Sequence, residues 1–163
     1  MPAAARSRAL ALFAQCGELA LAFPIADIDR VALSADIAVA PVTSELFRVA
    51  IDGEPPIAGW DLAALFGKRA SSRHTWVIIH ASVHGAPRGF ALACDRSLTV
   101  APARLELALP GGLFSKRAGA IVGAFTMRDG EVPTGLLVAA DRLLSDDDIA
   151  AAARAAGSGA LVW

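Results

Sequence analysis

Apolar positions along the chain fall into many short runs separated by turn residues, a pattern typical of β-structure. The clearest hairpin is predicted where Trp76–His80 and Phe90–Cys94 flank the turn residues 84–89. A second is predicted at Asp52-Gly53, because this dipeptide lies between two apolar runs and favours a tight reversal. Turn signals recur about every ten residues, as they do in small barrels and sandwiches.

Further strands are expected in segments that share short apolar runs broken by proline or glycine. These are Glu18–Leu33 with Pro24 near its middle, Asp36–Pro41, Leu46–Ile51, a strand pair over Ser97–Leu109 bent at Pro102, Ala120–Phe125, and Pro133–Val138.

Helix signals are confined to a few places. Asp61 is expected to cap one short helical turn that ends at Gly67. Ser145 with three aspartates after it predicts a capped helix over residues 145–157. The apolar run Ala9–Ala14 favours an N-terminal helical arm over a secretory signal, because Gln15 ends the run early.

The repeated hairpins predict a mostly β fold of two small five-stranded barrels, of the SH3 or OB type, packed on a shared core. Within a single domain of residues 1–163, the first barrel is expected over 17–67, the second over 74–144, and a C-terminal helix over 145–157. Each barrel alone would bury little apolar area, so the two are expected to pack face to face.

Composition narrows the functional classes. The chain is 55% hydrophobic with a mean hydropathy of +0.52, yet no apolar stretch is long enough to span a bilayer. Cys16 and Cys94 are far apart and form no CxxC motif, which favours buried free thiols and a cytoplasmic location. A net charge of −1 with scattered arginines predicts no nucleic-acid footprint and no membrane contact.

No residue pattern predicts catalysis, a metal or a cofactor. His80, His84 and Cys94 lack a fourth zinc ligand. The chain has no GxSxG nucleophile motif, and Gly67-Lys68 lacks the rest of a phosphate-binding loop. The acids of 146–148 are explained by helix capping, so we expect a protein that is not an enzyme.

Over about Glu18–Leu144 this plan resembles the CheW-like domain of bacterial chemosensory signalling. The resemblance is carried by four segments in order: Ala22–Ile28; Pro41 through Trp60-Asp61-Leu62; Val77–Ile79 through Phe90–Asp95; and Ile121–Ala124, Asp129-Gly130 and Leu136–Val138 through Leu144.

The resemblance implies two five-stranded barrels around one apolar core, with no cofactor and no reaction. It also implies an adaptor that couples chemoreceptors to a CheA-type histidine kinase, whose regulatory domain has the same fold. The implied partners are that regulatory domain, the receptor signalling tip and other CheW-like domains. The implied location is cytoplasmic, with recruitment to membrane-associated receptor arrays.

One departure from the family concerns its first hairpin, which usually reads Asn-Leu-Arg-Gly with the arginine in the receptor-facing region. Here Ala50–Glu54 keeps the glycine but has acids on both sides of it. A reversed charge at an interface can cost several kcal/mol against the usual partner. The expected partner-binding residues are Arg48 (a candidate replacement for the arginine), Asp52, Gly53 and Glu54, with Arg128, Asp129 and Gly130 on a later turn.

Two alternatives remain open from the sequence. The missing arginine is also consistent with a divergent member that has lost ordinary receptor coupling and regulates motility or another two-component pathway through a different partner. A small-barrel protein that binds single-stranded nucleic acid is the other, although it would need stacking aromatics on a basic groove. For each turn residue taken alone, a plain solvated turn is an equal interpretation.

Overall fold

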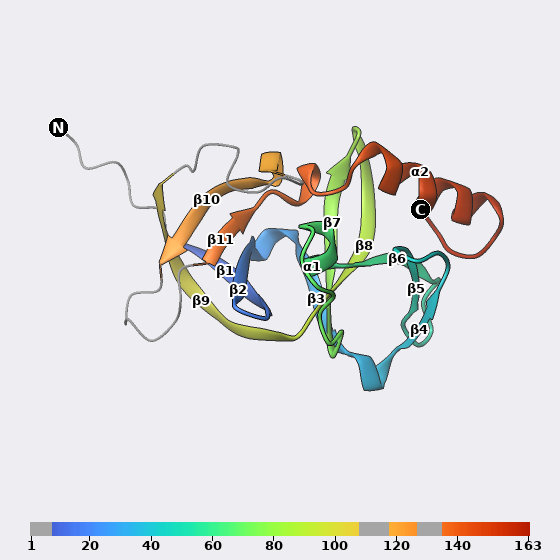
Figure 1. Cartoon of the computed structure of the whole chain (residues 1–163), viewed down its shortest axis with the longest axis horizontal. Helices are drawn as coiled ribbons and strands as arrows, with labels where there is room; N and C mark the ends of the chain where they lie inside the picture. The colour runs from blue at the N-terminus through green and yellow to red at the C-terminus, as the bar shows by residue number, and fades with distance from the viewer. Residues whose placement is uncertain (1–7, 108–117, 127–134) are drawn as a thin grey trace.

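The computed structural model describes residues 8–107, 118–126 and 135–163, and it is mostly β (Figure 1). Two sheets stand side by side, and a C-terminal helix runs along one end of the second (Figure 1). Within the part of the chain that the structure describes, no helix is long and apolar enough to cross a membrane.

The first sheet is a closed five-stranded barrel in the order β1-β2-β11-β10-β9. Its strands are β1 (Arg8–Cys16), β2 (Leu19–Pro24), β9 (Arg96–Leu107), β10 (Ile121–Thr126) and β11 (Gly135–Val138). All neighbours are antiparallel except β11 and β2, which run parallel with Leu136 opposite Leu21. The barrel therefore closes through a parallel pair of strands that lie far apart in sequence.

The second sheet has six strands in the order β3-β7-β8-β6-β5-β4. They are β3 (Ile28–Leu33), β4 (Ala38–Pro41), β5 (Phe47–Ala50), β6 (Ile57–Asp61), β7 (Thr75–Val83) and β8 (Ala86–Cys94). Only β6 and β8 are parallel, and β3 and β4 form the two edges.

The mostly β, two-subdomain architecture with a C-terminal helix is confirmed, but the subdomains do not follow the division at 17–67 and 74–144. β2 joins the barrel, whereas β3 to β6 pair with β7 and β8 in the second sheet. The parallel pairs β2–β11 and β6–β8 decide this arrangement. They join segments far apart in sequence, and hydrophobic periodicity does not specify such partners.

The expected N-terminal helical arm is wrong, because residues 8–16 form strand β1. β1 pairs with β2 on one side and β9 on the other, so its backbone groups are satisfied inside a barrel. Phe13 is fully buried, and its ring packs against the backbone of Gly135. A Cβ added to Gly135 would lie only 2.5 Å from the Cε1 atom of this ring. Tertiary pairing overrides the helical preference of the alanines.

Where the sequence predicts a strand pair over Ser97–Leu109, the described residues up to Leu107 form one continuous strand, β9. Pro102 lies opposite Leu10 of β1, whereas β10 pairs with β9 only from Arg104 to Leu107. The proline therefore occupies a stretch with a single strand neighbour, where its missing N–H is tolerated.

The apolar core lies between the barrel and the second sheet, as expected. It combines barrel residues such as Leu21 and Phe23 with sheet residues such as Trp60, Ile79 and Phe90. Apolar side chains of the two α-helices complete it. The two halves therefore bury their apolar faces against each other in one shared core.

The helices begin as the sequence predicts. The Asp61 carboxylate accepts from Ala64 N at the start of α1 (Leu62–Leu65), and Ser145 and Asp148 form a capping box on α2 (Asp146–Gly157). Four short 3-10 turns lie in the described residues: η1 (Ile25–Asp27), η2 (Ser34–Asp36), η3 (Ala118–Ala120) and η4 (Ala140–Arg142).

Candidate interaction surface

The predicted Asp52-Gly53 hairpin is present as the turn between β5 and β6. Gly53 has φ +75°, a conformation that favours glycine, and Glu54 N donates to Ile51 O at 3.0 Å. Asp52, Gly53 and Glu54 are all exposed. Three of the expected partner-binding residues are thus available at one end of the second sheet.

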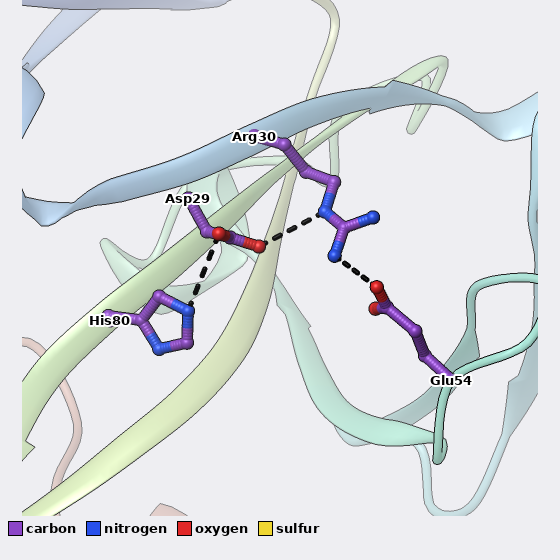
Figure 2. A network of polar contacts seen from close by, with 4 residues as sticks. All are labelled: Asp29, Arg30, Glu54 and His80. Carbon is purple, nitrogen blue, oxygen red and sulfur yellow. Dashed lines mark hydrogen bonds and ion pairs between the residues drawn. The ribbon is translucent and has the colours of Figure 1, made fainter.

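A basic side chain from another strand reaches this hairpin. Arg30 on β3 donates through Nη2 to Glu54 Oε1, and its Nε donates to Asp29 Oδ2 at 3.0 Å (Figure 2). His80 Nε2 on β7 lies 3.7 Å from Asp29 Oδ1. The hydrogen bonds from Arg30 to Glu54 and then to Asp29 raise the pKa of the guanidinium above its ordinary value. All four side chains are partly or largely exposed, so the network is a surface feature.

A β-bulge explains how adjacent residues enter the same network. Ile28 lies opposite Ile79 and Arg30 opposite Ile78, so Asp29 is an extra residue on β3. A bulge of this kind places two residues against one on the neighbouring strand and redirects their side chains. Sequence reasoning missed Asp29 and Arg30, since no local signal marks a bulge or links β3 to a hairpin about twenty residues away.

The network borders a pocket of about 260 Å³. Asp29, Arg30, Glu54 and His80 supply its charged and polar part, and the remaining lining comes from Ile51, Pro55, Ile57, Ile78 and Gly89. A pocket of this size with a charged border can accept a single side chain of a protein partner.

Arg48 is placed differently from the expectation that it replaces the family's arginine. It lies on β5, half-buried, and its Nε donates to Ala160 O at 2.9 Å, near the end of the chain. Arg48 therefore binds the backbone carbonyl of Ala160, whereas Arg30 is the basic side chain that pairs with Glu54 of the hairpin turn. Arg128, Asp129 and Gly130 lie outside the described residues.

Carboxylates that carry the resemblance have structural roles. Asp61 is buried and accepts from Ser71 N and Ser71 Oγ as well as from Ala64 N. Asp95 accepts from Gly17 N at 2.6 Å and Ser72 N at 2.7 Å, and these backbone bonds lower the pKa of Asp95 below its ordinary value. Asp95 thereby joins the β1–β2 turn of the barrel to the segment before β7.

The possible metal ligands and nucleophiles do not converge. Within residues 8–107, 118–126 and 135–163, no three side chains of His, Cys, Asp or Glu are grouped to hold a metal ion. His84 Nε2 lies 3.3 Å from Asp146 Oδ1, whereas His80 Nε2 lies 3.7 Å from Asp29 Oδ1, so the two histidines face different carboxylates. Cys16 and Cys94 are buried free thiols, and burial raises the pKa of each to about 12, so both are protonated at neutral pH.

Comparison with known proteins gives a structural match. No protein-family model matches the chain, and no curated protein sequence matches it. Among solved structures, it is similar to the scaffolding protein CheW from Thermoanaerobacter tengcongensis, with 19% sequence identity and a TM-score of 0.62. The match covers 86% of this chain and 95% of that one, so the two share the CheW-like fold.

Proposed function

We propose that this protein is a non-catalytic adaptor in a bacterial chemosensory system, where it couples receptors to a CheA-type histidine kinase. The observation that carries the proposal is the CheW-like fold over nearly the whole chain. The similar structure is a scaffolding protein, and such proteins act through their surfaces. The adaptor would be recruited to membrane-associated receptor arrays.

The β5–β6 hairpin supports this role physically. The tip of the hairpin is exposed, and the sheet to which it belongs packs with one face on the main core. The hairpin is therefore held in place before a partner binds, so binding costs little conformational entropy. Standard interfaces bury about 800 Å² per partner and take most of their energy from a few residues. The exposed hairpin turn, together with Arg30 and His80, offers a small group of residues that would supply such binding energy.

The test is direct binding to the purified regulatory domain of a CheA-type kinase encoded in the same genome, measured by calorimetry and by co-purification. We expect a stoichiometric complex. Charge reversal by Asp52→Lys should weaken it about tenfold or more, since a like-charged contact at an interface costs several kcal/mol. Glu45→Lys, the same change on an exposed loop of β4–β5, is the matched control and should bind as the unaltered protein does. Failure to bind any kinase, receptor tip or like-folded adaptor would sink the proposal.

A second candidate is a divergent adaptor that no longer couples to ordinary receptors. The observation that favours it is the charge arrangement, in which acids stand on the hairpin turn and Arg30 approaches from β3 to pair with Glu54. Asp52→Arg separates the candidates in a receptor-tip binding assay. A strong gain in affinity indicates that receptor coupling has been lost in this chain, and an unchanged affinity shows that the position is irrelevant.

A further inference from the structure

The end of α2 redirects the chain toward the second sheet. Gly159 has φ +82°, its N–H donates to Ala156 O at 3.0 Å, and Ala160 N donates to Ala155 O at 2.9 Å. This pair of bonds around a glycine in the left-handed region is a Schellman motif, which ends a helix and reverses the chain. Figure 1 shows the chain turning back after α2. We define residues 160–163 as the C-terminal segment.

The backbone of the C-terminal segment is bound on both flanks of the β5–β6 hairpin. Arg48, before the turn, donates from Nε to Ala160 O at 2.9 Å. After the turn, Val162 N donates to Pro56 O at 2.7 Å, and Val162 forms a parallel bridge with Ile57. The segment thus behaves as a very short extra strand beside the start of β6.

Side chains anchor the same segment to the core. The centre of the Trp163 ring lies 6.0 Å from the centre of the Trp60 ring, at an interplanar angle of 75°. It lies 6.4 Å from the centre of the Phe90 ring. The Arg88 guanidinium lies 5.3 Å from the centre of the Trp163 ring, within range of a cation–π interaction. Leu161 is buried, whereas Val162 is 55% exposed. Leu161 and Trp163 therefore anchor the segment through their side chains, and Val162 contributes through its backbone.

These contacts, together with the ion pair of Arg30 and Glu54, hold the hairpin from two directions. We propose that the C-terminal segment is a latch that sets the position of the β5–β6 hairpin, and that Arg48 and Trp163 are positioning residues for docking. Neither residue needs to touch the partner. The effect on partner affinity rests on the proposed function, whereas the effect on the hairpin does not.

The test follows amide hydrogen exchange by NMR in Trp163→Ala. The Val162 amide reports the latch, the Glu54 amide reports the hairpin turn, and the Asp95 amide, which donates to Gln15 O at 2.9 Å, reports the junction far from the latch. We expect exchange at Val162 and Glu54 to rise about tenfold, which corresponds to ~1.4 kcal/mol, with Asp95 changed less than twofold.

Matched variants guard against a general loss of structure. Val162→Ser alters an exposed side chain in the same segment but keeps the backbone N–H, so exchange should stay as in the unaltered protein. Trp163→Phe keeps an aromatic ring and should restore most of the protection. Arg48→Met removes the donor to Ala160 from the opposite side and should reproduce the Trp163→Ala pattern.

Two outcomes would overturn the latch. In one, Val162 exchanges faster while Glu54 is unchanged, so the hairpin does not depend on the segment. In the other, Asp95 accelerates as much as Glu54 in both variants, so the segment is only part of the global fold. If the latch opens as expected but the unaltered protein binds no kinase domain, the proposed function fails and the latch stands.

Discussion

The barrel and the six-stranded sheet pack on one core, but the barrel is closed and the sheet has two open edges. In the barrel each strand has two neighbours, since β11 closes onto β2. The second sheet stays open, and β3 and β4 each have one strand neighbour in the part of the chain that the structure describes. An open edge presents unpaired backbone groups, which attract other strands unless they are protected.

The two open edges are protected by different features. β4 carries Pro41, and β3 carries the bulge with the charged Asp29 and Arg30, which are devices that discourage strand addition. Val31 and Leu33 on β3 are 38% and 56% exposed. The comparison shows that the barrel has no open strand edge among the described strands, whereas the second sheet keeps two edges that a proline, a bulge and charged side chains protect.

The largest effect should come from emptying the barrel with Phe13→Ala. Phe13 is fully buried beside Ala11 and Ala22, and loss of a buried Phe side chain costs about 3–5 kcal/mol. Urea unfolding measures the change. Leu33→Ala on the open edge is the control and should change the free energy of unfolding by about 0.5 kcal/mol or less. Equal losses in the two variants would show that the interior of the barrel is no more tightly packed than the exposed edge of the sheet.

A smaller loss is expected from Gly135→Ala at the closure of the barrel. A Cβ there would lie 2.5 and 2.7 Å from two atoms of the Phe13 ring, and the ring must move inside a closed structure. Such overpacking costs about 1–3 kcal/mol. Gly157→Ala at the end of α2 meets nothing within 4 Å and should be neutral or slightly stabilising in thermal unfolding. A neutral Gly135→Ala would show that the barrel is loosely closed.

The link between barrel and sheet should depend on pH through Asp95. Because backbone hydrogen bonds lower its pKa in the folded state, the native protein binds fewer protons than the unfolded chain. The stabilisation from Asp95 is therefore full above the ordinary pKa of about 4 and is lost as pH falls through the lower folded value. Asp95→Asn should reduce stability at pH 7 and flatten the slope below about pH 4. Chemical unfolding at several pH values measures both effects, and an unchanged slope would contradict them.

The smallest effect on folding is expected from Leu33→Lys on the β3 edge. The free energy of unfolding should stay within about 0.5 kcal/mol, because the side chain is largely exposed. Any self-association at high concentration should decrease, since a charge on an edge opposes strand pairing. Analytical ultracentrifugation gives the readout, and stronger association in the variant would contradict the edge argument.

Local features of the fold were predictable from the sequence. The caps at Asp61 and Ser145 follow from the side chains of a few adjacent residues, and so does the turn at Gly53. The β7–β8 hairpin was also predicted, although its turn is shorter than 84–89. His84 and Gly85 both have positive φ, which makes a two-residue turn and lets the strands continue to Val83 and Ala86.

Non-local features could not be predicted in the same way. The alanines of residues 8–16 favour a helix locally, and only pairing with β2 and β9 makes this segment a strand. The meeting of Arg30 with Glu54 depends on the bulge in β3 and on the folding of the β5–β6 hairpin beside it. Arg48 stays a predicted partner-binding residue, but its hydrogen bond to Ala160 O joins residues far apart in sequence and could not be predicted from local pattern.

The parallel pairing of β11 with β2 also has a consequence for biosynthesis. Leu21 leaves the ribosome well before its strand neighbour Leu136 is synthesised, because β9, β10 and all of the second sheet lie between them in sequence. Until then β2 lacks one side of its ladder, and long-range pairing of this kind slows folding. The nascent chain therefore keeps the apolar strand β2 without its parallel neighbour while the residues between the two strands are made, and during that time one edge of β2 is open to non-native pairing.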